Sequence, residues 1–262
     1  MELQGKTALV TGGNSGIGLA TARLMLEQGA RVAITGRDRA KLDAAVNELG
    51  GDVVAIAADL NRADDLANVA RIVGEKFGKL DIVFANAGIS GPTPLGATPY
   101  EAFTEILNTN LTSVFFTVQA VLPLLTDGAA IVLNGSVMRE LAVAGTSAYS
   151  AAKAGITGMA KVLATELAPR GIRVNTVIPG ATRTPIWTRG AREGATLDAT
   201  EAYLAPRIPL GRLALAEEVA AAALFLASPR ASGITAAEIV VDGGTLGAPS
   251  GGAMFRAPVS AR

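Results

Sequence analysis

Short apolar runs alternate with helix-like segments along most of this chain. The first run covers residues 7–11, a helical spacing of apolar side chains follows over 17–28, and the next run covers 32–35. Strands that alternate with helices pair in parallel through right-handed crossovers. The runs are continuously apolar, which is typical of parallel strands covered on both faces. The alternation therefore predicts an α/β fold built on a parallel sheet.

The same pattern predicts the boundaries of the remaining elements. Further strands are expected at 53–57, 80–85, 130–134, 173–178 and 238–241. Further helices are expected from the N-cap Asp38 to 49, and at 61–77, 99–125, 147–167 and 217–226, with a break near 108–110. No shift in composition marks a domain boundary, so one domain is expected over residues 1–262. Two segments depart from the alternation: 185–207 is expected to be a flap over a site, and 247–262 a C-terminal tail.

The chain contains no cysteine and no histidine, which excludes many kinds of catalytic site. Thiol nucleophiles, Ser-His pairs and zinc sites built on imidazole or thiolate are impossible, and no metal site is expected. Acid–base chemistry must therefore come from Asp, Glu, Tyr or Lys, helped by a cofactor. The 23 basic and 23 acidic residues give a formal net charge of zero, which offers no support for a nucleic-acid or anionic-membrane partner.

The N-terminal residues lack the basic and then apolar pattern of a signal peptide. The longest strongly apolar stretch, 219–227, is too short to span a bilayer. A cytoplasmic location is therefore the default expectation.

A glycine-rich loop joins the first strand to the first helix. It has the spacing Gly-x-x-x-Gly-x-Gly over residues 12–18. Glycines allow a tight turn and a close approach of the backbone to a ligand. The free N–H groups and the positive end of the helix dipole favour a pyrophosphate. In this strand-to-helix context the loop predicts a dinucleotide site, whereas a glycine-rich stretch alone could be an ordinary turn.

A tyrosine and a lysine provide a second pattern. Tyr149 and Lys153 lie four residues apart in a predicted helix, so their side chains share one face. Alone, such a pair usually marks a solvated helix surface. Here Ser136 precedes Tyr149 by thirteen residues, and the glycine loop with its preceding Thr11 stands at the start of the chain. Together these elements resemble the short-chain dehydrogenase/reductase family. The resemblance implies a Rossmann-like, doubly wound parallel sheet of seven strands in the order 3-2-1-4-5-6-7, with helices on both faces.

The resemblance implies four catalytic residues, Asn110, Ser136, Tyr149 and Lys153. Tyr149 would be the acid for ketone reduction and the base for alcohol oxidation. Lys153 and an oxidised nicotinamide would lower the phenol pKa from its ordinary value of about 10. Ser136 would donate a hydrogen bond to the substrate oxygen. Asn110, which breaks its helix, would hold a water that links Lys153 to solvent, and the hydride would come from the pro-S face.

The resemblance also implies a set of cofactor-binding residues. They are Gly12, Asn14, Ser15, Gly16, Ile17, Gly18, Arg37, Asp59, Leu60, Asn86, Ala87, Gly88, Tyr149, Lys153, Pro179, Gly180, Thr182 and Thr184. Family members that prefer NAD end the second strand with an acidic residue, where this chain has Gly36 followed by Arg37. An arginine there can pair with a 2′-phosphate, so NADP(H) is expected to be preferred. NAD(H) remains possible, because Asp38 is close by and Ser15 stands where some NADP-preferring members carry a second basic residue.

The expected substrate wall is mostly apolar and indicates a neutral, fairly hydrophobic ketone or secondary alcohol. Its residues are Ser136, Met138, Val143, Tyr149, Ala181 and Trp187, with Trp187 as either a substrate contact or a packing anchor. Arg139, Arg183 and Arg189 could instead bind an acidic substrate. The predicted function is NADP(H)-dependent carbonyl reductase or secondary alcohol dehydrogenase, acting on a small molecule.

Two alternatives remain open. The first is a reductase of 3-oxoacyl groups on acyl carrier protein; of the two basic positions expected for that acidic partner, Arg170 is present but Asp127 occupies the other. The second is a non-catalytic protein that senses NADP, although such relatives usually lose the tyrosine or the lysine. Family resemblance also implies a homotetramer.

Overall fold

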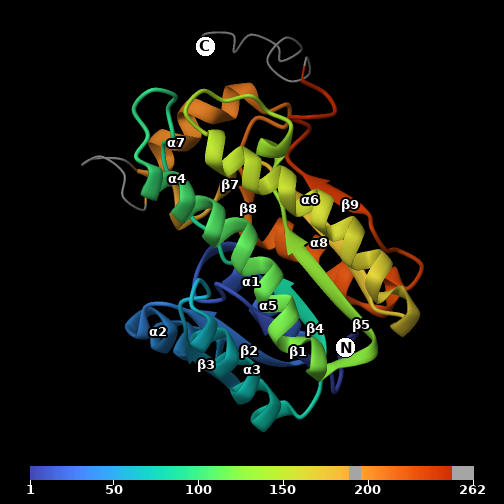
Figure 1. Ribbon diagram of the computed structural model, residues 1–262. Helices are drawn as coiled ribbons and strands as arrows, with labels where there is room; N and C mark the ends of the chain where they lie inside the picture. The colour runs from blue at the N-terminus through green and yellow to red at the C-terminus, as the bar shows by residue number, and fades with distance from the viewer. Residues whose placement is uncertain (189–195, 250–262) are drawn as a thin grey trace.

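The computed structural model describes residues 1–188 and 196–249. Its centre is a parallel sheet of seven strands, which confirms the predicted fold class (Figure 1). In spatial order these strands are β3 (Val53–Ala57), β2 (Arg31–Gly36), β1 (Thr7–Val10), β4 (Leu80–Ala85), β5 (Leu125–Asn134), β6 (Arg173–Pro179) and β9 (Glu238–Val241). The expected order 3-2-1-4-5-6-7 is confirmed, with β9 as the seventh strand. A separate two-residue pairing joins β7 (Thr182–Arg183) to β8 (Ala214–Leu215).

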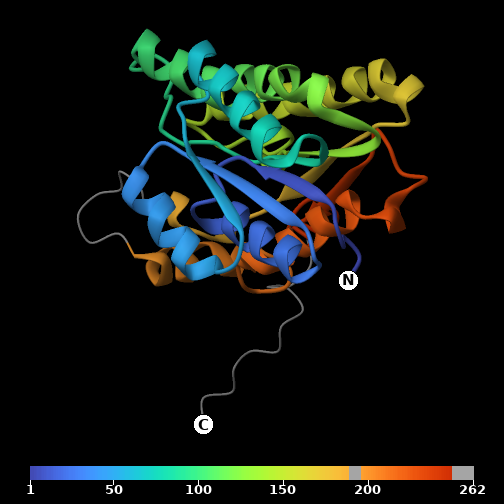
Figure 2. The same ribbon diagram turned by 90° about the horizontal axis from the view of Figure 1, so that it is seen from below.

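Helices cover both faces of this sheet (Figure 2). One layer contains α1 (Gly16–Glu27), α2 (Arg39–Leu49) and α8 (Ala216–Ala227). The other contains α3 (Ala63–Phe77), α5 (Ser113–Val121) and α6 (Ser147–Leu167), with α4 (Tyr100–Leu107) packed against α6. The short helix α7 (Leu197–Leu204) lies within the segment expected to be a flap.

The strands supply apolar side chains to two separate cores. In β1, Ala8 and Val10 pack with α1, α2 and α8, whereas Leu9 packs with α3, α5 and α6. Alternate residues of a strand point to opposite faces. A strand that is buried on both sides must therefore be apolar throughout, which explains the continuous runs.

The long helical stretch expected at 99–125 differs from the structure in two ways. It ends in a 3₁₀ turn at Leu122–Leu124, which contains Pro123, and β5 then begins at Leu125 rather than at 130. Proline cannot donate a helical hydrogen bond, so the helix stops there. The expected break near 108–110 is a π-helical turn, Asn108–Thr112, between α4 and α5.

Two other boundaries follow from side chains that bind the backbone. Asp38 is the N-cap of α2, as expected, and its carboxylate accepts the N–H of Lys41. Helix α3 begins at Ala63 rather than 61, because Asp59 accepts the N–H of Asn61 in a turn that precedes the helix.

The flap and the tail are described in part. The flap contains a 3₁₀ turn at Pro185–Trp187, helix α7 and a second 3₁₀ turn at Ala205–Arg207, while residues 189–195 lie outside the described part. Of the expected tail, only 247–249 are described. Within the described ranges, no helix combines the length and apolar character needed to cross a membrane.

Candidate active site

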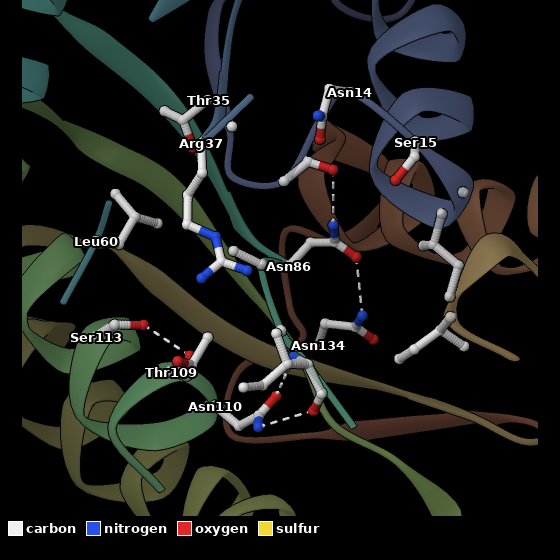
Figure 3. Close-up of a pocket in the computed structure, with 18 of the residues that line it drawn as sticks. Asn14, Ser15, Thr35, Arg37, Leu60, Asn86, Thr109, Asn110, Ser113 and Asn134 are labelled. Atoms are coloured by element: carbon white, nitrogen blue, oxygen red, sulfur yellow. Dashed lines mark hydrogen bonds between the residues drawn. The ribbon is translucent and has the colours of Figure 1, made fainter. Parts of the chain in front are cut away.

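A cleft of about 400 Å³ opens at the carboxyl ends of the strands (Figure 3). The chain leaves β1 toward β2 on one side, while β4 pairs with β1 on the other. Loops that follow such a switch point diverge and leave a crevice for a ligand. The cleft is lined by the loops after β1, β2, β3 and β4, by the end of β5 and by α6.

Most residues expected to bind a cofactor line this cleft. They are Gly12, Asn14, Ser15, Gly16, Ile17, Arg37, Asp59, Leu60, Asn86, Ala87, Gly88, Tyr149, Lys153 and Thr184. Gly18, Pro179, Gly180 and Thr182 do not line it. Gly18 lies beneath the glycine loop, and the hydroxyl of Thr182 bonds to the Gly180 carbonyl oxygen.

The glycine loop is held open by its backbone conformation. Gly12 and Gly16 have φ angles of +63° and +54°, a region that favours glycine. Ser15, at the start of α1, makes no side-chain capping bond, so the first N–H groups of the helix remain available to an anion. The hydroxyl of Thr11 accepts the N–H groups of Asn86 and Ala87, at 2.9 and 3.0 Å. These contacts join the loop to the end of β4, and the resulting cradle fits a dinucleotide pyrophosphate.

Gly18 provides a direct test of this cradle. A Cβ at this position would lie 2.3 Å from the Gly12 carbonyl oxygen and 2.6 Å from Asn86 Nδ2. We expect Gly18→Ala to push the loop away from β4, to lower the free energy of unfolding by about 1–3 kcal/mol and to weaken cofactor binding. Chemical unfolding and calorimetric titration measure the two effects. Gly233→Ala is the control, because a Cβ at that position would have no atom within 4 Å; equal behaviour of the two variants would contradict the prediction.

Lys153 is a buried cation at one end of the cleft. Its side chain is 4% exposed, and Nζ donates to the backbone oxygen of Asn134 at 2.7 Å. Burial disfavours the charged form and lowers the pKa of Lys153 to about 8. Nζ lies 5.7 Å from the centre of the Tyr149 ring, so the helical spacing does bring the two side chains together.

Tyr149 faces Ser136, the third residue of the expected catalytic group. Burial raises the pKa of the Tyr149 phenol, and a side-chain hydrogen bond from Ser136 opposes this rise. The lowering by Lys153 expected from sequence is therefore not the main influence on the phenol in the cofactor-free protein. Ser136 Oγ also accepts the N–H of Met138 at 3.2 Å, which fixes the hydroxyl beside the phenol. Ser136 itself does not line the cleft.

Asn110 lies in the π-helical turn and is fully buried. Its Nδ2 donates to the carbonyl oxygens of Ile89 and Ile106, and its Oδ1 accepts the N–H of Ile89. The side chain thus joins the widened helical turn to the loop after β4 (Figure 3). The Asn110 amide is thus engaged within the protein, and the expected role of this residue in holding a water stays a prediction.

The helix that carries Tyr149 and Lys153 is capped by a residue from a distant loop. Thr146, at the N-terminus of α6, uses its hydroxyl on the Val143 oxygen rather than on a first-turn N–H. The buried hydroxyl of Thr93 accepts the N–H of Ala148 instead, at 3.1 Å, and the Thr93 N–H donates to Gly145. Sequence patterns around α6 could not reveal this cap, because Thr93 is more than fifty residues away.

We expect Thr93→Val to loosen the start of α6 and to displace the Tyr149 phenol. The lost cap costs about 0.5–2 kcal/mol of stability, and misplacement of the phenol lowers kcat by about ten- to a hundredfold. The KM for the cofactor should change little, because Thr93 does not line the cleft. Steady-state kinetics test this, with Thr93→Ser as the variant that restores the hydroxyl. An unchanged kcat for the valine variant would refute the capping role.

The expected substrate wall is less well formed than the cofactor cleft. Met138, Val143, Ala181 and Trp187 do not line the cleft. The indole N–H of Trp187 donates to the Thr182 oxygen at 2.8 Å, so this side chain anchors the 3₁₀ turn of the flap to β7. Val143 is exposed, and no described contact ties it to the other wall residues.

The arginines considered for an acidic substrate are already paired. Arg139 forms ion pairs with Glu238 and Glu140. Arg183 pairs with Asp198 and Glu201 of α7 and so ties β7 to the flap. Arg189 lies outside the described residues. Across 1–188 and 196–249, no three residues among Asp and Glu gather as a candidate metal site.

Several residues of the cleft are absent from the expected cofactor set, although Gly36 and Asp38 were considered beside Arg37. These additional residues are Thr35, Gly36, Asp38, Lys41, Ala58, Asn61, Ile89, Thr109, Ser113, Asn134, Pro185 and Ile186. Lys41 could have been found, because it follows Arg37 by four residues at the start of a helix. Asn61 donates to the Thr109 hydroxyl at 2.9 Å and bridges the turn before α3 to the π-helical turn. The Asn61–Thr109 hydrogen bond depends on tertiary packing, which the sequence pattern does not reveal.

A doubly wound parallel sheet, a glycine cradle at its first turn and a tyrosine beside a buried lysine define a dinucleotide-dependent oxidoreductase. A family model described as enoyl-(acyl carrier protein) reductase matches residues 12–245. The chain belongs to the short-chain dehydrogenase/reductase family, as the sequence motifs predicted.

Relatives with established names cover almost the whole chain. A 3-oxoacyl-[acyl-carrier-protein] reductase from Vibrio cholerae is 37% identical over 93% of this chain and 98% of its own length. A cyclohexanol dehydrogenase from an Acinetobacter species is 34% identical over 92% of this chain and 95% of the relative. A short-chain dehydrogenase structure from Burkholderia cenocepacia, in complex with NADP, superposes with a TM-score of 0.85 at 36% identity, covering 94% of this chain and 99% of that one.

Proposed function

We propose that this protein is an NADP(H)-dependent carbonyl reductase, and in reverse a secondary alcohol dehydrogenase, for neutral and fairly hydrophobic substrates. The observation that carries the proposal is the Tyr149 phenol, which faces Ser136 and whose ring centre lies 5.7 Å from Nζ of the buried Lys153 at one end of the cleft. A bound nicotinamide would supply the hydride for reduction and accept it for oxidation.

The side chains of this chain would handle the proton and the substrate oxygen. The raised pKa of Tyr149 keeps the phenol protonated near neutral pH, so it can donate a proton to the alkoxide formed from a ketone. The Ser136 hydroxyl would donate a hydrogen bond to the same oxygen and stabilise its developing charge. Lys153 would bind the ribose hydroxyls and, once an oxidised nicotinamide is bound, favour the phenolate needed for oxidation.

The preference for NADP(H) rests on two cations near the end of β2. Arg37 extends over the cleft (Figure 3). Lys41 lines the cleft from the first turn of α2. Asp38, between them, is engaged with α2: its carboxylate accepts the Lys41 N–H and lies 3.6 Å from Lys41 Nζ. The backbone N–H of Lys41 holds the pKa of Asp38 below its ordinary value. Lys41 shares its charge with Asp38, so Arg37 is the one of these two cations that has no carboxylate partner in the described part of the chain, and its guanidinium favours a 2′-phosphate.

The proposal of a neutral substrate is supported by the charges around the flap. Arg139 and Arg183, the described arginines considered for an acidic substrate, are each paired with two carboxylates. Breaking these ion pairs would offset part of the free energy gained by binding an acidic substrate. The cyclohexanol dehydrogenase among the relatives acts, by its name, on a neutral cyclic alcohol.

The test is the oxidation of NADPH and of NADH with a panel of aryl, cyclic, aliphatic and 3-oxoacyl carbonyl compounds. We expect fast NADPH oxidation with a cyclic or aryl ketone. Arg37→Leu should weaken NADPH binding by about ten- to a hundredfold and leave NADH binding nearly unchanged, since a charge-assisted hydrogen bond is worth about 1.5–3 kcal/mol. Arg39→Leu is the matched control, because Arg39 pairs with Asp43 outside the cleft. A preference of the wild type for NADH would refute the proposed preference for NADP(H) but would leave the proposed reaction intact.

A second candidate is reduction of 3-oxoacyl groups on acyl carrier protein, which the name of the Vibrio cholerae relative favours. Against it, Arg170 is used within the chain: it pairs with Asp127 at 2.9 Å and donates to the carbonyl oxygens of Leu122 and Leu125. It also follows the far end of α6, about 27 Å along the helix from Tyr149. Activity restricted to 3-oxoacyl thioesters in the panel would select this candidate.

We also infer that the protein is a homotetramer. Phe115 and Phe116 on α5 and Val162 on α6 are large apolar side chains exposed to solvent. Burying them against a second copy would remove apolar area from water. Light scattering coupled to size exclusion measures the mass directly, and a mass other than that of four copies would overturn this inference.

A further inference from the structure

Asn134, the last residue of β5, joins the two ends of the active site. Its backbone oxygen accepts the Lys153 ammonium at 2.7 Å. Its side-chain nitrogen donates to Asn86 Oδ1 at 2.9 Å, and the Asn86 nitrogen donates in turn to the Thr11 oxygen at 2.9 Å. Figure 3 shows this row of amides running from the glycine loop to the end of β5. No sequence motif singled out Asn134.

One atom of this residue has no partner. Asn134 Oδ1 is out of contact with solvent, and no donor in the described part of the chain bonds to it. The orientation of the amide follows from its neighbour, because the Asn86 nitrogen is already committed to Thr11 and its oxygen therefore needs the Asn134 nitrogen. Figure 3 shows the Asn134 oxygen turned away from Asn86. A buried acceptor without a donor is costly, so such an atom in a binding cleft points to a ligand that supplies the donor.

The chemistry of the cofactor restricts which part of it could supply that donor. The phosphates carry acceptors only near neutral pH. The adenine end is expected near Arg37 and Leu60, whereas Asn134 is bonded to Lys153 at the opposite end of the cleft. The remaining donors are the two ribose hydroxyls and the carboxamide NH₂ of the nicotinamide nucleoside.

We propose that Asn134 is a positioning residue whose Oδ1 accepts a hydrogen bond from the nicotinamide nucleoside half of the bound cofactor. Through its other two bonds, the same residue holds Lys153 and, by way of Asn86, the glycine loop. It would thereby fix the position of the nicotinamide relative to the pyrophosphate cradle and to the Tyr149–Lys153 pair. This inference rests on the function proposed above.

The test compares two ligands on the wild type and on Asn134→Leu, which keeps the shape of the side chain but removes its polar atoms. Calorimetry measures the affinity for NADP⁺ and for adenosine 2′,5′-bisphosphate, which carries the adenine half alone. We expect the variant to bind NADP⁺ about three- to tenfold more weakly, the effect of one hydrogen bond, and to bind the bisphosphate as the wild type does. If Asn134→Leu does not fold, Asn134→Ala removes the same oxygen without adding bulk.

The possible outcomes separate the inference from the proposed function. If the variant binds NADP⁺ as tightly as the wild type does, the inference about Asn134 is overturned. It is also overturned if the variant binds both ligands more weakly by the same factor, because Asn134 would then act only through Asn86 and the loop. If the wild type binds NAD⁺ rather than NADP⁺, the cofactor proposal fails, and the comparison is repeated with NAD⁺ and AMP. The 3-acetylpyridine analogue, which lacks the carboxamide NH₂, identifies the donor. If the wild type loses affinity for it and the variant does not, the donor is the carboxamide; equal losses identify a ribose hydroxyl.

Discussion

Tyr149→Phe is expected to lower kcat for ketone reduction by about a hundred- to ten-thousandfold, the usual contribution of a positioned proton donor. The phenylalanine ring keeps the apolar packing but cannot protonate the alkoxide. Cofactor binding should change by less than threefold, because the phosphate cradle and Lys153 remain. Stopped-flow kinetics with NADPH, together with a fluorescence titration of the cofactor, separate the two quantities.

The chain supplies a matched control for this variant. It has three tyrosines, and Tyr100 is exposed at the start of α4 outside the cleft. Tyr100→Phe should therefore keep full turnover. A Tyr149→Phe protein that retained its biological effect without turnover would favour the non-catalytic sensor over the enzyme.

Lys153→Met is expected to lower activity and, in the cofactor-free protein, to raise stability at neutral pH. Moving the pKa of Lys153 from 10.5 in the unfolded chain to about 8 in the folded protein corresponds to about 3 kcal/mol. Between these values the unfolded chain binds the proton and the folded protein does not. The stability that this group contributes is thus present above pH 10.5 and is lost as the pH falls through about 8.

The measurement is chemical unfolding of the wild type and Lys153→Met at pH 7 and near pH 10, without cofactor. We expect the variant to be more stable by about 1–3 kcal/mol at pH 7, after the lost hydrogen bond to Asn134 is subtracted, and the difference to shrink at the higher pH. Lys161→Met, on the exposed face of the same helix, should change stability by less than about 0.5 kcal/mol. A variant that is less stable at both pH values would show that the ammonium is not buried at a cost.

The parts of the site that depend on local sequence were predictable. The glycine loop, the residues at the carboxyl ends of β2, β3 and β4, and the helical pair Tyr149 and Lys153 all lie at the cleft. Each is specified within a few residues by a strand end, a turn or a helical period. Parallel strands bring such ends to one edge, so the chain order of the motifs was enough to place them together.

The contacts that cross the fold were not predictable in the same way. The hydroxyl of Thr93 caps α6, and the amide of Asn134 bonds to Asn86, but neither residue belongs to a local pattern. The start of β5 was misplaced because Thr126, Asp127 and Gly128 interrupt its apolar run. The substrate wall was inferred from loop composition, which says little about where loop side chains point.

The strand order has a consequence for how the protein is made. Strand β1 lies inside the sheet between β2 and β4, and its neighbour β4 is encoded more than seventy residues later, since Val10 pairs with Phe84. The cleft is lined by residues that extend along the chain from Gly12 to Ile186. A growing chain therefore cannot assemble a complete cofactor site until most of it has left the ribosome. Such long-range pairing slows folding and leaves apolar strand edges exposed until their neighbours have been made.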